Sequence, residues 1–129
     1  MTRILVADDD RDVRTALRDA LASEGYEVET AANGERAMRM HENAPADILI
    51  TDLFMPEQDG LETLQHFRAR YPNMPIVVIS GWKHGQKTDH LAVAQHAGAN
   101  VILRKPFELG ELLARLETLI SDMNAAPKD

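Results

Sequence analysis

The chain has 129 residues, of which 44% are hydrophobic and 27% charged, so it fits one globular domain and is too short for two ordinary ones. The net charge of −7 argues against direct nucleic-acid binding, and no hydrophobic run is long enough for membrane insertion. The absence of cysteine excludes disulfides and thiolate chemistry, which suits a cytoplasmic protein.

The first third of the chain predicts two strand–helix units. Residues 3–7 are apolar, as in a buried strand, and Asp10 after them is a natural N-cap for a helix that stops at Gly25. The next segment alternates apolar and charged residues, which is typical of a strand at a sheet edge. The elements expected here are strands at 3–7 and 26–30 and helices at about 11–24 and 34–42.

The middle of the chain is organised around Asp52. Residues 47–51 form a short apolar run that predicts a buried strand, and Asp52 follows at its C-terminal end. A carboxylate in that position is costly unless its charge is used. After the loop 52–59 we expect a helix over 60–70, buried through Leu61, Leu64 and Phe67, and a strand over 76–80.

The last part predicts two more helices and one more strand. After the connection 81–87 we expect a helix over about 88–97, a strand over 101–103 and a helix over about 108–121. Gly110 in the last helix is interpreted as allowing a close contact. The apolar residues of this helix recur at helical spacing: Leu109, Leu112, Leu113, Leu116, Leu119 and Ile120.

Five strands that alternate with five helices predict an α/β fold, a doubly wound parallel sheet with right-handed crossovers. The first, third and fourth strands are continuously apolar and should be central, which favours the flavodoxin-like order 2-1-3-4-5. Ligands of such sheets bind beyond the C-terminal strand ends, at the switch point between strands one and three. Asp8, Asp9 and Asp52 all fall there.

Three carboxylates in one crevice repel each other, by about 4 kcal/mol for a pair about 4 Å apart at an effective dielectric constant near 20. A shared cation or protonation relieves this repulsion, and an oxygen-only ligand set favours Mg²⁺. Ser80 and Lys105, at the ends of strands four and five, add a hydroxyl and an ammonium group on the same rim. Together these groups can hold phosphoryl oxygens, and a carboxylate can itself attack phosphorus.

With these residues, the chain resembles the receiver domains of bacterial response regulators over nearly its whole length. The matching segments are residues 4–10 (ILVADDD), 52–56 (DLFMP) with 59–60 (DG), 77–81 (VVISG), 97–99 (AGA) and 105–107 (KPF). The resemblance implies a CheY-like phosphoacceptor signalling protein of a two-component system, which catalyses at most its own phosphorylation and dephosphorylation. It also implies a receiver domain over 1–122, acting alone, with a short tail over 123–129.

The resemblance implies a role for each site residue. Asp52 would accept a phosphoryl group from the phosphohistidine of a sensor histidine kinase or phosphotransfer protein. Asp9, Asp52 and the backbone carbonyl of Phe54 would bind Mg²⁺, with Asp8 acting through a metal-bound water. Ser80 and Lys105 would bind phosphoryl oxygens.

The resemblance also implies a cis peptide bond between Lys105 and Pro106. The output would be contact with a downstream protein through the fourth helix, fifth strand and fifth helix, by a monomer or a phosphorylation-dependent dimer.

Two departures from the family pattern bear on signalling. Ile102 stands where the family often has an aromatic switch residue, so the usual coupled ring movement is not assumed. The connection after Ser80 is longer than is common, and we hypothesise that Phe54 and Trp82 flank the phosphoryl group and hinder hydrolysis.

Two other functions fit parts of the pattern. Asp8 and Asp10 have the Asp-x-Asp spacing of small aspartate-nucleophile phosphohydrolases, with Asp8 as nucleophile, although this leaves Asp52 unexplained. A receiver-like interaction module without phosphorylation is the other alternative. A histidine metal site is disfavoured, because the six-residue spacing of His84, His90 and His96 does not align them on one helix face.

Overall fold

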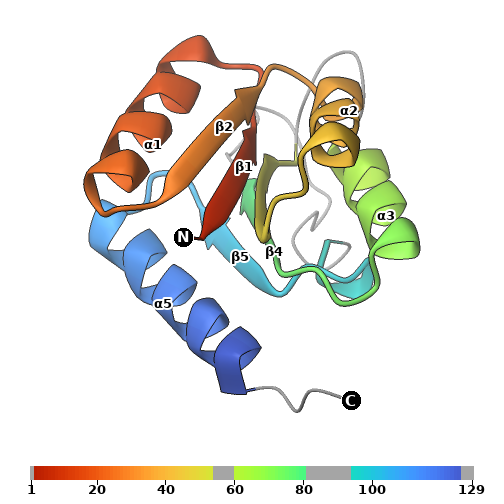
Figure 1. Cartoon of the computed structure of the whole chain (residues 1–129). Coiled ribbons are helices and arrows are strands. Elements are labelled where there is room, and N and C mark those ends of the chain that lie inside the picture. Colours follow the sequence, from red (N-terminus) through yellow and green to blue (C-terminus); the bar gives the residue numbers. More distant parts are fainter. Residues whose placement is uncertain (1, 54–59, 81–93, 126–129) are drawn as a thin grey trace.

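The computed structural model describes residues 2–53, 60–80 and 94–125 of the chain, as helices and strands of one α/β domain (Figure 1). The strands are β1 (Arg3–Ala7), β2 (Glu27–Ala31), β3 (Ile48–Asp52), β4 (Ile76–Ser80) and β5 (Val101–Arg104). The helices are α1 (Arg11–Ser23), α2 (Gly34–Asn43), α3 (Gly60–Arg70) and α5 (Leu109–Ala125). Most of the helix expected over 88–97 lies outside the described residues, and residues 94–96 are helical.

The strands form a parallel sheet in the order β2-β1-β3-β4-β5, which confirms the expected topology and the edge position of β2. Ala7 pairs with Thr51 across β1 and β3, and Ser80 pairs with Arg104 across β4 and β5. This register aligns the C-terminal ends of β1, β3, β4 and β5 at one edge of the sheet. The residues that follow these strands therefore meet at that edge.

Helices cover both faces of the sheet, α1 and α5 on one side and α2 and α3 on the other (Figure 1). Alternate residues of each strand point to opposite faces and build two cores. One core joins the sheet to Leu17 and Leu21 of α1 and to Leu112 and Leu116 of α5. The other includes Leu64 and Phe67 of α3.

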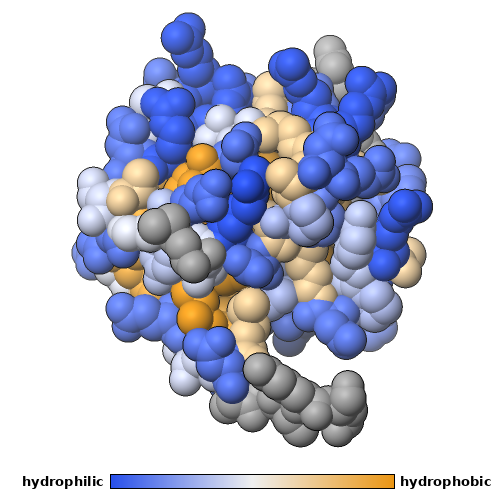
Figure 2. Space-filling model, viewed as in Figure 1, coloured by the Kyte–Doolittle hydropathy of each residue, from blue (hydrophilic) through white to orange (hydrophobic). Residues whose placement is uncertain are grey.

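Hydrophilic side chains cover most of the face shown in Figure 2, and hydrophobic surface is visible in smaller areas between them. No helix in the described segments is both long and apolar enough to cross a membrane.

The ends of α1 and α2 follow from local sequence. The Asp10 carboxylate accepts hydrogen bonds from the backbone N–H groups of Asp12 and Val13, at 2.9 and 3.4 Å, and so caps α1 as expected. Gly25 just beyond α1 has a φ of 95°, a conformation that glycine adopts without strain. Asn33 caps α2 in the same way as Asp10 caps α1.

Several expectations about the helices and strands need correction. Asp47 precedes β3 rather than beginning it, and its carboxylate accepts a hydrogen bond from the backbone N–H of Arg3 at 2.8 Å. Helix α5 continues to Ala125 rather than ending at residue 121, because neither glycine nor proline occurs between residue 121 and Pro127.

The expected close contact at Gly110 is wrong, and Leu109 is exposed although it belongs to the apolar spacing of α5. A methyl group added at Gly110 would meet no atom within 4 Å, and Leu109 is 40% exposed. Helical spacing indicates on which side of a helix a residue lies. It does not indicate whether another part of the protein packs over that turn of the helix.

Candidate functional site

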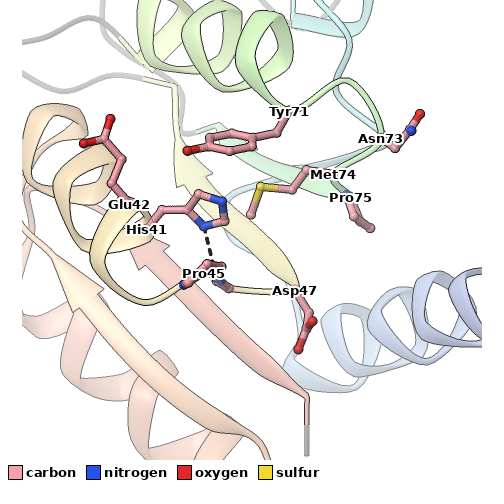
Figure 3. Close-up of a pocket in the computed structure, with 9 residues that line it drawn as sticks. His41, Glu42, Pro45, Asp47, Tyr71, Asn73, Met74 and Pro75 are labelled. Atoms are coloured by element: carbon pink, nitrogen blue, oxygen red, sulfur yellow. Dashed lines mark hydrogen bonds between the residues drawn. The ribbon is translucent and has the colours of Figure 1, made fainter.

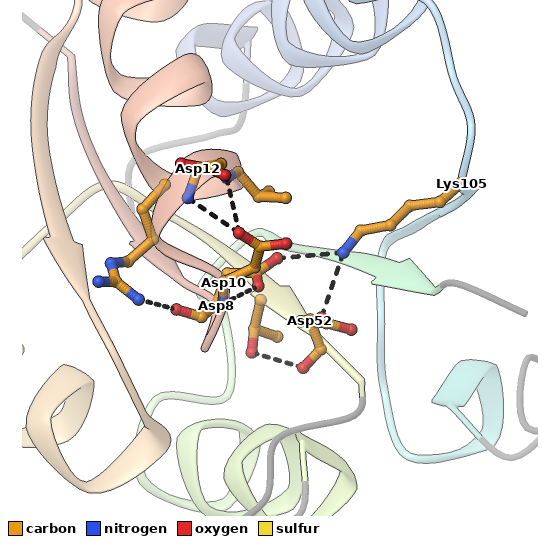
Figure 4. Close-up of polar contacts among 8 residues, drawn as sticks. Asp8, Asp10, Asp12, Asp52 and Lys105 are labelled. Atoms are coloured by element: carbon orange, nitrogen blue, oxygen red, sulfur yellow. Dashed lines mark hydrogen bonds and ion pairs between the residues drawn. The ribbon is translucent and has the colours of Figure 1, made fainter. Parts of the chain in front are cut away.

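The expected site residues that the structure describes lie at the C-terminal edge of the sheet, and Figure 4 shows Asp8, Asp52 and Lys105 there. Asp8 follows β1 directly, Asp52 is the last residue of β3, and Ser80 is the last residue of β4. Lys105 follows β5, and its side chain extends toward both carboxylates. Segments from opposite ends of the chain thus supply one site.

A shared lysine joins the two buried carboxylates. The Lys105 Nζ atom lies 3.2 Å from Asp8 Oδ2 and 3.2 Å from Asp52 Oδ2. The side chains of Asp8 and Asp52 are only 2% and 8% exposed, against 27% for Lys105. Low exposure strengthens these charge interactions, because water screens them less.

Four polar groups of Asp8 are engaged. Its backbone N–H donates to the carbonyl of Ala31 at 3.1 Å, and its own carbonyl accepts from Arg14 Nη1 at 2.8 Å. Its Oδ1 accepts from the backbone N–H of Asp10 at 2.9 Å, and its Oδ2 accepts from Lys105. Asp8 is therefore held in one orientation before any ligand arrives.

The charges of the site shift two pKa values. Burial raises the pKa of the Asp8 carboxyl and the Asp52 charge raises it further, while the Asp10 N–H and Lys105 act against this rise. Burial lowers the pKa of Lys105, but the charges of Asp52 and Asp8 and the hydrogen bonds they accept outweigh it and leave the pKa raised. Lys105 is therefore a cation at neutral pH.

The acidic cluster suits a hard cation. Asp8, Asp9 and Asp52 each offer a carboxylate oxygen, and these oxygens lie within 4.8 Å of one another. One ammonium group, that of Lys105, contacts two of these three carboxylates. An oxygen-only donor set with excess negative charge is the kind that Mg²⁺ prefers.

The ends of β4 and β5 are joined beside this cluster. The backbone N–H of Lys105 donates to the carbonyl of Ser80 at 2.8 Å, and Ser80 is buried. The peptide bond between Lys105 and Pro106 is cis, as expected. The hydroxyl-bearing residue and the lysine are thus held on adjacent strands.

The model of the response regulator receiver domain matches residues 4–117 of this chain. The chain belongs to the response regulator receiver family. Response regulator MprA of Mycobacterium ulcerans is 41% identical over 118 residues, which cover 92% of this chain and 50% of that protein. The chain spans about half the length of the curated relatives it matches.

Solved structures of receivers support the same assignment. Chemotaxis protein CheY4 of Vibrio cholerae is 31% identical with a TM-score of 0.82, covering 92% of this chain and 98% of that one. Response regulator TrrA of Thermotoga maritima, solved in complex with Mg²⁺ and BeF, is 32% identical with a TM-score of 0.80, covering 92% of this chain and 99% of that one. This protein is therefore the receiver domain of a two-component response regulator.

Three contacts of this receiver were not anticipated from the sequence. Arg14 binds the carbonyl of Asp8, and the Thr51 hydroxyl donates to the carbonyl of Asp52 at 3.1 Å. Gly60 begins α3 so close to β3 that an added Cβ would lie 2.3 Å from the carbonyl oxygens of Asp52 and Leu53. The position of Arg14 in the sequence did carry a signal. A cation in the first turns of a helix opposes the helix dipole, so its presence there suggests a specific contact.

Four residues singled out in the sequence lie in segments that the structure does not describe. Phe54, Trp82, His84 and His90 lie outside the described residues, so their expected roles stay predictions. Ile102, at the usual aromatic switch position, is partly buried and packs against the core that includes Phe67.

A hollow lies at the opposite edge of the sheet, near the N-terminal ends of β3 and β4 (Figure 3). It has a volume of about 390 Å³ and lies between the end of α2 and the turn before β4. His41 is 5% exposed there, accepts a hydrogen bond from the Ala46 N–H at Nδ1 at 3.0 Å, and packs edge-on against Tyr71 with ring centroids 4.4 Å apart. Burial lowers the pKa of His41, although Glu42 partly offsets this, so His41 is a neutral structural residue at neutral pH.

Proposed function

We propose that Asp52 of this receiver accepts a phosphoryl group from the phosphohistidine of a sensor histidine kinase or phosphotransfer protein, in a Mg²⁺-dependent reaction. The observation that carries the proposal is the joint contact of Lys105 with Asp8 and Asp52, within the acidic cluster that includes Asp9. Such a set of one cation and three carboxylates is suited to holding a phosphoryl group with a divalent ion.

Asp52 is the best placed nucleophile of this set. Its backbone is held by the end of β3 and by the Thr51 hydroxyl, so its carboxylate is presented from a rigid element. One carboxylate oxygen attacks phosphorus to form a P–O bond, and the P–N bond to the donor imidazole breaks. The bonding electron pair stays on the imidazole nitrogen, so the donor is released as an ordinary histidine.

Lys105 and Ser80 would bind the transferred group. The ammonium group already lies 3.2 Å from an Asp52 oxygen, and it would move to a phosphoryl oxygen once negative charge arrives there. The Ser80 hydroxyl, held on the adjacent strand, would donate to a second phosphoryl oxygen. Both groups act by neutralising or hydrogen-bonding charge rather than by proton transfer.

The donor set also fits Mg²⁺ as the cofactor. Asp9 and Asp52 would be direct ligands, with the backbone carbonyl of Phe54 as a third, and Asp8 would act through a bound water. When bound, the ion supplies positive charge that offsets repulsion between the carboxylate and the incoming phosphoryl oxygens. Without the ion, three carboxylates would face the doubly charged phosphoryl group. Lys105 would then be the only cation in contact with these carboxylates in the described part of the site.

Phosphorylation would change which protein the receiver binds. The contact between the Lys105 N–H and the Ser80 carbonyl joins the site to β5, and α5 follows β5 in the chain. We infer that the output surface includes the fourth helix, β5 and α5, in the cytoplasm, with a monomer or a phosphorylation-dependent dimer as the active form. The downstream target is a protein.

The test is chemical labelling with acetyl phosphate and Mg²⁺, followed by borohydride reduction, which converts an aspartyl phosphate to homoserine. Peptide mapping is expected to find homoserine at position 52 in the wild type and no labelling in Asp52→Asn. Labelling at another position, or in the absence of Mg²⁺, would contradict the proposal.

The phosphohydrolase alternative makes Asp8 the nucleophile. Both Asp8 carboxylate oxygens already accept hydrogen bonds and the side chain is nearly inaccessible, which disfavours attack by it. The same labelling experiment separates the two functions, because homoserine at position 8 would support the hydrolase. For an interaction module without phosphorylation, millimolar Mg²⁺ would leave the melting temperature unchanged.

A further inference from the structure

The Arg14 side chain reaches from α1 to the peptide bond that joins Asp8 and Asp9. Its Nη1 atom donates to the Asp8 carbonyl at 2.8 Å, in a partly buried contact across six residues. The carbonyl oxygen of Asp8 and the N–H of Asp9 belong to the same planar peptide unit. A hydrogen bond to this carbonyl therefore helps to fix the plane from which Asp9 extends.

Asp8 and Asp9 differ in how their carboxylates are held. Both Asp8 oxygens accept hydrogen bonds, from the Asp10 N–H and from Lys105. Asp9 is exposed, and no hydrogen bond to its carboxylate is present in the segments that the structure describes. The position of the Asp9 carboxylate thus depends on its backbone, and Arg14 is the side chain that contacts this backbone unit.

Arg14 has two opposing effects on a cation at the cluster. Its positive charge, near Asp8 and in the first turns of α1, repels a cation and opposes the helix dipole. Its hydrogen bond instead holds the Asp8–Asp9 peptide in the orientation that brings oxygens of Asp8, Asp9 and Asp52 within 4.8 Å of one another. The two effects predict opposite changes in Mg²⁺ affinity when Arg14 is replaced.

We propose that Arg14 is a positioning residue for Mg²⁺ binding, acting through the Asp8 carbonyl rather than by touching the ion. The inference rests on the proposed Mg²⁺-dependent function and adds to it a residue outside the expected site. Groups that orient metal ligands commonly contribute about 10- to 100-fold to metal affinity. The hydrogen bond of Arg14 is expected to outweigh its charge repulsion, which is screened by water at this partly exposed position.

The test is calorimetric titration of the whole chain with Mg²⁺ alone. Arg14→Gln removes the charge and shortens the side chain, and its Mg²⁺ dissociation constant is expected to rise about tenfold. Arg14→Lys keeps the charge and one donor, and should fall between Arg14→Gln and the wild type. Arg18→Gln is the matched control, because Arg18 is an exposed arginine of the same helix that contacts Asp19 rather than Asp8.

Two further measurements separate positioning from a general structural role. Urea unfolding in EDTA reports stability without the ion, and the carbonyl ¹³C chemical shift of Asp8 reports its hydrogen bond directly. Positioning predicts a changed ¹³C shift together with weakened Mg²⁺ binding in both Arg14 variants. A lower stability with an unchanged Mg²⁺ dissociation constant would show a structural role only and would overturn the inference.

The outcomes also distinguish this inference from the proposed function. Equal or tighter Mg²⁺ binding by Arg14→Gln, with normal binding by the wild type, would overturn the role of Arg14 and leave the function standing. Absence of Mg²⁺ binding in the wild type would overturn both. If Arg14→Gln does not fold, Arg14→Lys decides by the same criteria.

Discussion

The two edges of the sheet bury polar side chains in opposite ways. At the C-terminal edge, Asp8 and Asp52 are buried and share the charged Lys105. At the other edge, His41 is buried among aromatic rings, neutral at neutral pH, with Nδ1 satisfied by the Ala46 N–H. A buried neutral group with a partner costs little, whereas gathered carboxylates repel each other and are retained for a ligand.

The two edges also respond to acid with opposite sign. The pKa of His41 is lowered, so the unfolded chain takes up its proton first and stability falls as the pH drops below 6.5. The pKa of Asp8 is raised above its ordinary 3.8, so the metal-free folded protein takes up that proton first and gains stability as the pH falls through the raised value. Burial thus disfavours the charged form of both His41 and Asp8.

The largest expected effect comes from closing the space at Gly60. Gly60→Ala would place a methyl group 2.3 Å from the carbonyl oxygens of Asp52 and Leu53, which cannot be accommodated without moving β3 or α3. We expect a loss of about 3 kcal/mol in the free energy of unfolding, measured in urea, because backbone on both sides resists the shift. The matched control is Gly110→Ala, where the space is open and a gain of up to about 1 kcal/mol is expected.

Replacing Asp8 tests whether its buried carboxylate lowers the stability of the metal-free protein. In EDTA, Asp8→Asn is expected to raise the free energy of unfolding by about 1 kcal/mol while weakening Mg²⁺ binding, since a buried charge is removed. Asp47→Asn is the control at the other edge, where the carboxylate is exposed, and it should change stability by less than about 0.5 kcal/mol. A clear loss of stability in Asp8→Asn would mean that its pairing with Lys105 outweighs its burial.

The pH dependence of stability sharpens the contrast further. In EDTA, the urea midpoint of the wild type should decline as the pH falls below 6.5, where His41 protonates in the unfolded chain before the folded one. His41→Asn retains an acceptor for the Ala46 N–H without titrating in this range, so the decline should become smaller. An identical decline in both proteins would place the titrating group elsewhere.

The smallest expected effect concerns a buried hydroxyl that, unlike the buried polar groups at the two edges, has no hydrogen-bond partner in the described structure. Thr63 of α3 is fully buried, and its Oγ1 has no hydrogen-bond partner in the described structure. Thr63→Val keeps the shape and removes the polar atom, so we expect a gain in the free energy of unfolding of up to about 1 kcal/mol. Ser23, whose exposed hydroxyl donates to the Asp19 carbonyl, offers the control Ser23→Ala, with no gain expected.

Short-range sequence features were sufficient to predict most of the fold. Apolar runs, N-caps such as Asp10 and breakers such as Gly25 act within a few residues, so they locate elements to within one residue at most of the ends. The continuous apolarity of the first, third and fourth strands also predicted the sheet order. Parallel topology then places strand ends at one edge, which is why Asp8, Asp52, Ser80 and Lys105 could be grouped in advance.

Other features depended on packing between segments far apart in the chain. Sequence spacing says nothing about whether Gly60 touches β3, whether a neighbour covers Leu109, or whether His41 lies against Tyr71. Each of these depends on how closely two helices or strands pack in the folded protein. The contact of Arg14 with the Asp8 carbonyl is of the same kind, because a long side chain has many rotamers and the folded surroundings select one.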